Sequence, residues 1–315
     1  MFAPVVAKTT KLTAFIRIPN FLLRADAILR FCICSAQGRI VREGSMGART
    51  EDTEAEAEPR RSDFVSAVGR AMSILECFTS DEAVRQRGRL TLTEAARLTN
   101  LSRGTARRLL LTLAEIHYVD TDGKFFWLTP KLVNLSRGFL LPLGVGEGSA
   151  AILKTLTGKL DESASVGILD GEDIVYIERV EVRRIYSSRI VSGTRLPASC
   201  SSIGRILLAG LSDDDLRNWL KSYGLKPMTE KTITDVGQFW QEIEMIRAQG
   251  YAIIDEELEI GLRSISVPIR SANGRTMAAL NTSTIPARHS VESLRSDFLP
   301  ELLDAAKNLS RTMGW

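Results

Sequence analysis

The chain has 315 residues, of which 44% are hydrophobic and 25% are charged, and its formal net charge is +3. This length suits two domains better than one small domain, and the composition is that of an ordinary globular protein rather than a disordered one. No apolar run reaches the roughly 18 to 20 residues of a membrane span, so no membrane partner is expected. The four cysteines are scattered and fit a reducing cytosol rather than a disulfide framework, so we expect a cytoplasmic protein.

Residues 1–63 are expected to form a disordered or miscalled N-terminal extension. Segment 1–45 holds seven basic and two acidic residues, a composition that organelle transit peptides share. Alternatively, Met46 is the authentic start and the residues before it belong to a miscalled reading frame, which is the interpretation that we favour. Segment 46–62 is acidic, small and polar, which predicts a disordered tail.

Residues 64–129 carry the pattern of a winged helix-turn-helix domain. A first helix is predicted over 64–78, and its inward residues should be Val68, Ala71, Met72, Leu75, Cys77 and Phe78. A short second helix is predicted over 93–99, with Thr93 as its N-cap. A tight turn at Asn100-Leu101 should follow it.

The next helix is predicted to be a recognition helix. Ser102 can cap it, and it should extend to about Ile116. Its apolar residues recur at i, i+3, i+4 and i+7, which predicts one buried stripe of Ala106, Leu109, Leu110 and Leu113. A hairpin over 119–128 should follow, because Asp122-Gly123 is a strong signal for a type I′ turn. Lys124 would then lie at the tip of a wing, where it could meet phosphate.

Charge indicates that this domain binds DNA. Between Arg85 and Arg108 there are seven arginines and one acidic residue, Glu94. Arginine concentrated off the apolar stripe is typical of phosphate binding, and the N-terminal residues of a recognition helix meet base edges. The alternative is a packed helical hairpin with a solvated basic face.

The predicted DNA-binding residues lie on these helices and at the wing tip. Among them, glycine at 104 is unfavourable within a helix, but it could allow close approach of the backbone to DNA. The full set is Thr93, Ser102, Arg103, Gly104, Thr105, Arg107, Arg108 and Lys124.

Segment 130–148 is predicted to connect two domains. A linker helix should begin at Pro130 and extend to Leu140, and the glycine-rich residues 141–148 should break it. The spacing of Gly144, Gly146 and Gly148 resembles a phosphate loop, but no strand precedes it and no dinucleotide fingerprint follows it. A hinge is therefore the favoured interpretation.

The remaining chain, 149–315, has the pattern of an α+β domain. Strands are predicted at 165–169, 174–179, 185–190, 251–255, 263–269 and 276–284, and helices at 150–160, 202–209, 213–223, 234–249 and 290–312. Turns such as Asp170-Gly171 and Asn273-Gly274 favour hairpins, and therefore a central antiparallel sheet with helices packed on it. Acidic residues slightly outnumber basic ones here, so we do not expect this half to bind nucleic acid.

From about Phe64 to the C-terminus the chain resembles the IclR-type bacterial transcription regulators. The resemblance rests on the helix-turn-helix segment, on segments 195–205 and 250–264, and on Pro268, Asn273-Gly274 and the strand 278–283. Segments 128–130, 182–185 and 195–197 look most like one branch of the family. That branch controls aromatic-acid breakdown through the β-ketoadipate route, with effectors of the protocatechuate or 4-hydroxybenzoate type. Residues 1–60 fall outside the match.

The resemblance implies a winged helix-turn-helix domain joined by a linker helix to a GAF-like effector-binding and oligomerisation domain. It implies further a homodimer, or a dimer of dimers, that binds a partly palindromic operator and responds to an aromatic carboxylic acid. By matched position, the effector pocket of the family falls on Ser199, Cys200, Ser201, Ser202, Ile254, Asp255, Ser264, Asn281 and Ser283. Relatives that bind small keto-acids commonly carry cysteine in place of Ser264 and serine in place of Asn281, which implies a different ligand here.

The residues themselves also indicate a polar pocket. Asn281 and Ser283 are two apart on a predicted strand and so share a face, and Ser264 lies on the strand expected to pair with it. Buried hydroxyl and amide groups need partners, which a carboxylate-bearing ligand could supply. Alternatively, these groups bond to each other or to the backbone.

Two arginines, Arg184 and Arg263, are candidates for the cation that meets the ligand carboxylate. For each, the alternative is a structural salt bridge, for instance with the acids at 255–259. Cys200 is expected to be a pocket or core thiol, because no histidine near it could activate it as a nucleophile.

Three functions are open to such a chain, and a ligand-responsive transcription regulator is favoured because it uses both halves. An enzyme with an accessory DNA-binding arm is the alternative, but Asp255-Glu256-Glu257 would alternate faces of a strand, and no Walker loop or Gly-x-Ser-x-Gly elbow occurs. We therefore predict no catalytic residue. The four cysteines and two histidines lack metal-ligand spacing, so neither a metal nor a cofactor is predicted. A nucleoid architectural protein would not need the large acidic half.

Overall fold

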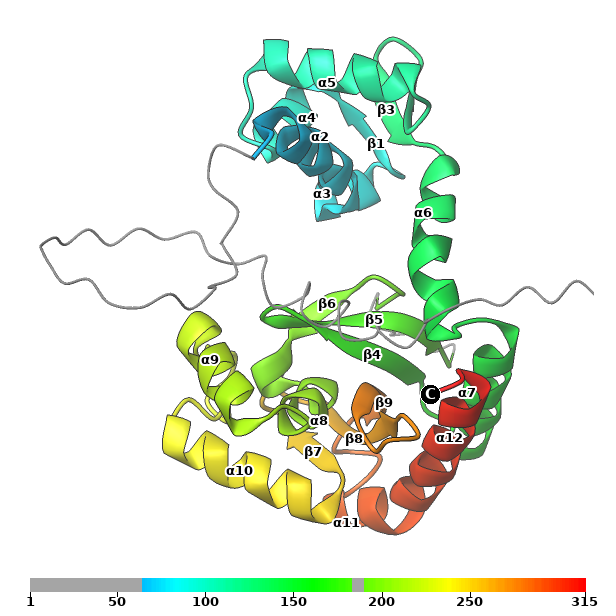
Figure 1. Ribbon diagram of the computed structural model, residues 1–315, viewed down its shortest axis with the longest axis vertical. Helices are drawn as coiled ribbons and strands as arrows, with labels where there is room; N and C mark the ends of the chain where they lie inside the picture. The colour runs from blue at the N-terminus through cyan, green and yellow to red at the C-terminus, as the bar shows by residue number, and fades with distance from the viewer. Residues whose placement is uncertain (1–63, 183–189) are drawn as a thin grey trace, which may run out of the picture. The chain divides into compact units, whose positions relative to one another are not determined.

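The computed structural model describes residues 64–182 and 190–315 (Figure 1). Contacts divide them into two compact units: one spans 64–150 together with 312–314, and the other spans the described part of 151–311 together with Trp315. Each unit has its own hydrophobic core. The predicted extension 1–63 and nearly all of the predicted strand 185–190 lie outside the described residues.

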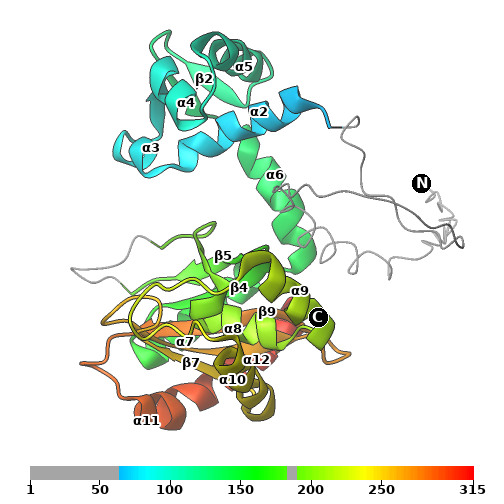
Figure 2. The ribbon, with the colours of Figure 1, turned by 90° about the vertical axis from the view of Figure 1, so that its left-hand side faces the viewer.

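The N-terminal unit is a helix-turn-helix followed by a β-hairpin, as predicted (Figure 2). Its strands β1 (Arg89–Thr91), β2 (Val119–Thr121) and β3 (Phe125–Leu128) form an antiparallel sheet in the order β1-β3-β2. A 3₁₀ turn, Cys77–Thr79, follows the first helix. The helices are α2 (Ser66–Glu76), α3 (Asp81–Arg85), α4 (Leu92–Leu98) and α5 (Arg103–Glu115).

Apolar residues of these elements form the core of the N-terminal unit. Helix α5 contributes Ala106, Leu110 and Leu113, as its periodicity predicted, and Leu109 is half-buried. In α2 the predicted inward set was partly wrong, because only the last turns of this helix reach the core. Its buried residues are Ile74 and Leu75, whereas Val68 and Met72 are 60% and 48% exposed.

Helix α4 begins earlier than predicted, with Thr91 rather than Thr93 as its N-cap. The Glu94 N–H donates to Thr91 Oγ1 at 3.3 Å, and the Thr91 N–H donates to the Glu94 carboxylate at 2.7 Å. This capping box satisfies two N–H groups that the helix itself leaves free. The bond from the Thr91 backbone and two side-chain bonds, from Gln86 and Thr91, lower the pKa of Glu94. Ser102 caps α5 as predicted, accepting from Thr105 N–H at 3.2 Å.

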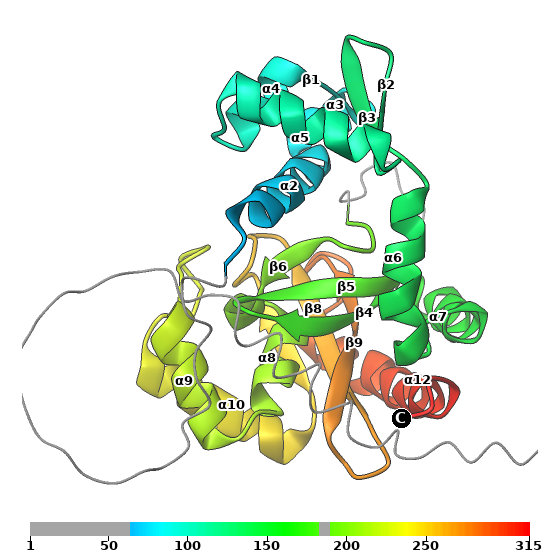
Figure 3. The same cartoon turned by 45° about the horizontal axis from the view of Figure 1, so that its top comes forward.

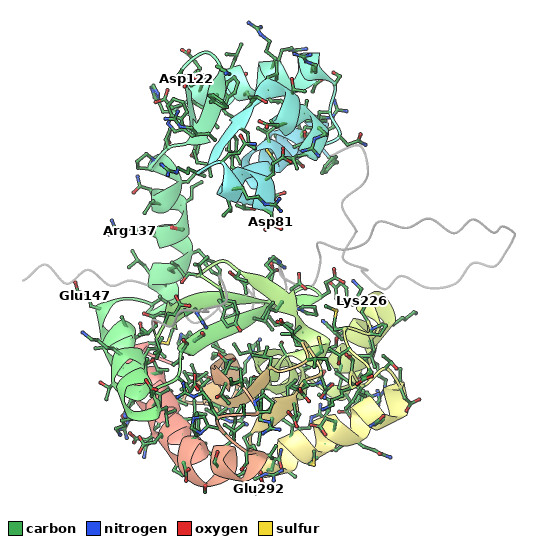
Figure 4. All side chains as sticks on the ribbon, turned by 180° about the vertical axis from the view of Figure 1, so that it is seen from behind. Asp81, Asp122, Arg137, Glu147, Lys226 and Glu292 are labelled. Atoms are coloured by element: carbon green, nitrogen blue, oxygen red, sulfur yellow. The ribbon has the colours of Figure 1, made fainter. Side chains whose placement is uncertain are left out.

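The turn of the wing is not of the predicted type. The Asp122 N–H donates to the Phe125 carbonyl at 3.3 Å, so that Gly123 and Lys124 are the central residues. Gly123 has a φ of +90° and Lys124 has no positive φ, whereas a type I′ turn needs positive φ at both central positions. The Asp122 carboxylate accepts from the N–H groups of Phe125 and Lys124, which lowers its pKa. Figure 4 labels Asp122 on this hairpin.

The linker consists of α6 (Lys131–Leu140) and a 3₁₀ turn (Leu141–Leu143) that ends at Gly144, whose φ is +70°. A Cβ on Gly144 would lie 2.5 Å from the Cα of Met313, so the close approach of the C-terminal backbone requires glycine here. Helix α7 (Glu147–Leu160) follows. In the described part of the chain no single helix is long and apolar enough to cross a membrane, although α6, with its 3₁₀ turn, and α7 pass that test as a bent pair.

The C-terminal unit is built on an antiparallel sheet, so the predicted α+β fold with a central antiparallel sheet is confirmed (Figures 1 and 3). Its strands pair in the order β6-β5-β4-β9-β8-β7. They are β4 (Ala164–Asp170), β5 (Asp173–Val180), β6 (Arg195–Pro197), β7 (Ala252–Asp255), β8 (Arg263–Arg270) and β9 (Thr276–Thr284). The short strand β6 was not predicted.

Helices cover both faces of this sheet. A 3₁₀ turn, Ala198–Cys200, leads into α8 (Ser202–Ala209), which packs on one face, with α9 (Asp213–Tyr223) and α10 (Val236–Gln249) beyond it. On the other side α7 and α12 (Leu299–Thr312) lie side by side, joined by the ion pair of Lys159 with Glu301 at 2.6 Å (Figures 1 and 3). The two faces therefore carry different cores, and only the α8 face adjoins the predicted pocket loop.

The predicted C-terminal helix over 290–312 is interrupted. Ser290 caps a single turn, α11 (Val291–Ser293), which a π-helical segment, Leu294–Phe298, joins to α12. Pro300 explains the wider turn, because it has no N–H to donate to the preceding turn.

Candidate functional site

Three arginines form an exposed face of α5: Arg103, Arg107 and Arg108. Arg103 and Arg107 are four residues apart and therefore neighbours on the helix surface. Within the described chain no ion-pair or hydrogen-bond partner is found for the side chains of these three arginines, whereas Arg89 pairs with Asp122 at 3.6 Å and Arg97 pairs with Glu82. Unpaired guanidinium groups at this position can meet phosphate oxygens or guanine edges.

The first turn of α5 brings the other predicted DNA contacts together. Ser102 Oγ lies 2.9 Å from Thr105 Oγ1, so these two hydroxyls are bonded to each other within the cap. Gly104 is exposed, and a Cβ there would meet nothing within 4 Å. The backbone of this turn is consequently open to close approach. Thr93 is exposed on α4 and takes no part in the cap.

The wing is joined to the rest of its unit by the pairing of β3 with β1, and Arg89 of β1 contacts its turn. The Arg89 guanidinium lies 3.6 Å from the Asp122 carboxylate and 4.8 Å from the centroid of the Trp127 ring. Lys124 is exposed at the turn, with Nζ 5.1 Å from the centroid of the Phe125 ring. Sequence reasoning counted Arg89 only toward the local positive charge, because its contacts with the wing depend on the pairing of β1 with β3.

In the C-terminal unit, polar side chains form a row across four neighbouring strands. Strand register aligns Arg179 of β5 with Ser165 of β4, Ser165 with Asn281 of β9, and Asn281 with Ser266 of β8. Aligned residues share one face of a sheet, so we call these four residues the polar row. The paired residues Ser264 and Ser283 lie two positions further along β8 and β9, and therefore on the same face.

The predicted loop residues 199–202 lie against this face. The Ser266 hydroxyl donates to Ser202 Oγ at 2.7 Å, which joins α8 to the polar row. Ser201 caps α8 by accepting from Gly204 N–H at 3.2 Å. Burial raises the pKa of the Cys200 thiol to about 11, so the thiol is neutral at physiological pH and unsuited to act as a nucleophile.

The buried side chain of Arg205 contacts the backbone of loop 199–202. Its Nη2 donates to the Glu257 carboxylate at 2.6 Å, and its Nε donates to the Ser199 carbonyl. Glu257 accepts in turn from the Ile233 N–H at 3.2 Å. The Arg205 guanidinium also lies 4.7 Å from the centroid of the Phe239 ring. The Arg205 guanidinium therefore links the loop to Glu257, and its role is structural.

The two predicted residues of β7 lie on opposite faces. Ile254 is aligned with Ser264 and shares the face of the polar row. Asp255 is aligned with Arg263 and accepts from its Nε and Nη2, each at 2.8 Å. Arg263 also donates to the His289 carbonyl at 2.8 Å. The structural salt bridge given as the alternative for Arg263 is thus observed, and Asp255 points away from the face of the polar row.

The polar side chains of β9 are bonded within the protein. Asn281 Nδ2 donates to Ser283 Oγ at 3.1 Å, and Asn281 is also hydrogen-bonded to the Tyr176 hydroxyl. Burial raises the pKa of Tyr176, so its hydroxyl stays neutral. The alternative in which these groups bond to each other therefore holds for Asn281 and Ser283 in this structure.

Arg179 supplies the charge of this face, while Arg184, the other predicted cation, lies outside the described residues. The Arg179 side chain is 10% exposed, and its Nη1 donates to Ser165 Oγ at 2.9 Å. Its Nε is buried and has no hydrogen-bond partner. Sequence reasoning missed Arg179, Ser165, Tyr176 and Ser266, because only the strand register places them beside Asn281.

Comparison with known proteins gives both units the same assignment. Residues 141–311 match the family described as bacterial transcriptional regulator IclR C-terminal, and residues 67–123 match the IclR helix-turn-helix domain. The chain is 37% identical over 248 residues to the Pca regulon regulatory protein of Pseudomonas putida. This match covers 78% of this chain and 84% of that protein.

Two solved structures extend the comparison. A transcriptional regulator from Rhodococcus sp. RHA1 is similar with a TM-score of 0.69 and 44% identity, covering 79% of this chain and 98% of that chain. A double mutant of the inducer-binding domain of PobR from Acinetobacter, in complex with 3-hydroxybenzoic acid, is similar with a TM-score of 0.50 and 30% identity. That match covers 53% of this chain and 98% of the PobR domain.

Proposed function

The chain belongs to the IclR family of bacterial transcriptional regulators, and we propose that it controls an operon for the breakdown of aromatic compounds in response to an aromatic carboxylic acid. The observation that carries the proposal is the polar row, a buried set of hydroxyl, amide and guanidinium groups on the sheet face next to loop 199–202. Similarity to a Pca regulon regulator and to a domain that binds a hydroxybenzoic acid supports the same ligand class.

On the DNA side, α5 reads bases and the wing meets phosphate. The proposed contacts are the first turns of α5 and the wing tip, namely Ser102, Arg103, Gly104, Thr105, Arg107, Arg108 and Lys124. Exposed apolar side chains on α2 and α6, such as Val68, Val133 and Phe139, support association with a second copy. A homodimer, or a dimer of dimers, then binds a partly palindromic operator in the cytoplasm.

On the ligand side, the pocket comprises loop 199–202, Ile254, Ser264, Asn281 and Ser283, together with the rest of the polar row. The ligand changes DNA binding only if it binds two states of the protein with different affinity. The linker through α6 and Gly144 is the segment through which such a change would pass. The family consists of transcriptional regulators, which sets aside the alternative of an enzyme with a DNA-binding arm.

The proposal is tested with the full chain and the DNA upstream of its own gene. Fluorescence anisotropy measures the affinity for this DNA with and without 4-hydroxybenzoate, 3-hydroxybenzoate or protocatechuate, and thermal shift measures binding of the same acids. A ligand at 100 times its Kd should stabilise the protein by about 2.7 kcal/mol. If none of these acids changes the melting temperature, the DNA affinity or transcription, the protein does not respond to this ligand class.

A further inference from the structure

We propose that Arg179 selects an aromatic monocarboxylic acid by pairing with the carboxylate of the ligand at one end of the polar row. The inference rests on the proposed function, since it concerns the same pocket, and it adds the residue that recognises the ligand and the number of carboxylates that the pocket accepts.

The first step is that Arg179 has a buried positive charge with little compensation. Its side chain is 10% exposed, and its hydrogen bond to Ser165 is to a neutral group. The Glu181 carboxylate lies 3.9 Å from Nη2, but the Glu181 side chain is 38% exposed, so this pair is held loosely in solvent. A buried guanidinium without a close anion is costly, and a bound carboxylate would remove that cost.

The second step is the geometry of the guanidinium. Because Nη1 is directed to Ser165, the edge formed by Nε and Nη2 is the one left for another group, and Nε is buried with no hydrogen-bond partner. This edge carries two N–H groups that point the same way, which is the arrangement that a carboxylate accepts in a bidentate manner. The orphaned Nε therefore identifies the direction from which an anion would approach.

Comparison with the other buried arginines of the unit sets Arg179 apart. Arg263 has both oxygens of Asp255 at 2.8 Å. Arg205 leaves one N–H group without a partner, but Glu257 at 2.6 Å neutralises its charge. Of these three arginines, only Arg179 lacks a carboxylate at hydrogen-bond distance.

The third step is the rest of the row, which is polar and uncharged. Asn281 and Ser283 can exchange their hydrogen bond to each other for bonds to a hydroxyl group of the ligand, and Ser264 is aligned with Ser283 on the same face. Among the described residues this part of the row offers no second cation, and a second carboxylate buried without one is strongly unfavourable. Neighbouring strands are roughly 4.8 Å apart, so Arg179 and Asn281, two strands apart, can address opposite ends of one aromatic ring. The pocket therefore favours hydroxybenzoates over dicarboxylic acids.

The test compares an acid with its uncharged amide. Calorimetric titration of the full chain measures Kd for 4-hydroxybenzoate, for 4-hydroxybenzamide and for the dicarboxylate cis,cis-muconate. The wild type should prefer the acid to the amide by about 30-fold or more, since loss of one partner of a buried charge pair has an effect of this size. Arg179→Gln should reduce this preference to near one, and Arg179→Lys should keep part of it. The matched control is Arg217→Gln, which removes an exposed arginine of α9 and should leave the preference unchanged.

The outcomes separate the two proposals. If the wild type binds the acid and Arg179→Gln keeps the full preference, Arg179 is not the anchor, while the proposed function stands. Muconate binding as tight as that of 4-hydroxybenzoate would overturn selection for one carboxylate. If Arg179→Gln does not fold, the wild type and Arg179→Lys decide, and an acid preference below about threefold in the wild type rejects the inference. If no aromatic acid binds while the protein still binds its DNA, both proposals fail.

Discussion

The two units of the chain use arginine in opposite ways. On α5, Arg103 and Arg107 are exposed and have no partner in the described structure, while in the C-terminal unit Arg205 is fully buried and bound to Glu257 at 2.6 Å. An exposed arginine stays hydrated in the free protein. When it binds a phosphate of DNA it displaces a counterion from the DNA, so it contributes to binding and little to folding. A buried arginine that loses its partner leaves an uncompensated charge, so it contributes to folding. The environment of the residue, not its type, therefore decides which property a substitution changes.

Loss of the buried ion pair between Arg205 and Glu257 should have the largest effect on stability. Glu257→Gln should lower the free energy of unfolding of the C-terminal unit by about 3 kcal/mol, because the buried Arg205 charge would keep only the Glu242 carboxylate, at 4.0 Å, in place of Glu257 at 2.6 Å. Urea unfolding followed by tryptophan fluorescence measures this change. Arg217→Met is the control, since its pair with Asp214 at 2.6 Å is exposed and should contribute 1 kcal/mol at most. Equal losses in the two variants would contradict the contrast between buried and exposed pairs.

The exposed arginines should give the opposite result. Arg103→Ala and Arg107→Ala are each expected to weaken operator binding by about 1–3 kcal/mol, if the lost contact is bidentate to guanine. Their unfolding curves should match the wild type, because no contact within the described protein is lost. Anisotropy titration measures the binding, with Arg217→Ala as a control for loss of one positive charge. Normal binding by both variants would show that α5 does not read the operator through this face.

The same contrast explains what the sequence could predict. The cap, the apolar stripe and the arginine face of α5 all follow from spacings of three or four residues, so Ser102, Leu110 and Arg107 were placed correctly. Arg179 was missed because its neighbours in the polar row come from other strands, and Asn281 is about a hundred residues away along the chain. Such a site depends on sheet register, which a single sequence does not specify.

The N-cap of α4 lies between the correctly predicted helix α5 and the missed Arg179, because the sequence contains the pattern of the correct cap. Thr91 and Glu94 fit the Thr-x-x-Glu spacing of a capping box, although Thr93, also a threonine, is the predicted cap. Both candidates lie within one turn, and local preference alone does not separate them. The bond from Glu94 N–H to Thr91 Oγ1 separates them in the structure.

The stability of the N-terminal unit should depend on Thr91 and not on Thr93. Thr91→Ala should destabilise the N-terminal unit by about 1 kcal/mol, whereas Thr93→Ala, at an exposed position, should stay within about 0.5 kcal/mol of the wild type. Thermal unfolding at pH 7 compares the two. A larger loss of stability for Thr93→Ala than for Thr91→Ala would mean that Thr93 caps α4.

The cap should also depend on pH. Hydrogen bonds, first that from the Thr91 backbone, lower the pKa of Glu94 in the folded state. A lowered pKa gives stability that is present above the unfolded value, about 4.3, and that is lost as the pH falls through the folded value. The stability difference between the wild type and Glu94→Gln should therefore shrink below about pH 4. A difference that stays constant down to pH 3 would mean that the carboxylate charge adds nothing to the cap.

Replacement of Lys124 in the wing should have the weakest effect on DNA binding, and it separates the role of the wing from that of α5. Lys124 is exposed at a turn in which the N–H groups of Lys124 and Phe125 donate to the Asp122 carboxylate, so its side chain can meet a phosphate without reading a base. Lys124→Ala should reduce the slope of log affinity against log salt by about 0.9, which is the value for one phosphate contact. It should weaken specific and non-specific DNA alike, whereas Arg103→Ala should weaken the operator more than other sequences. If Lys124→Ala instead changed the preference among operator variants, base reading would extend to the wing, and the exposed charges of this unit would no longer divide into α5 for sequence and the wing for affinity.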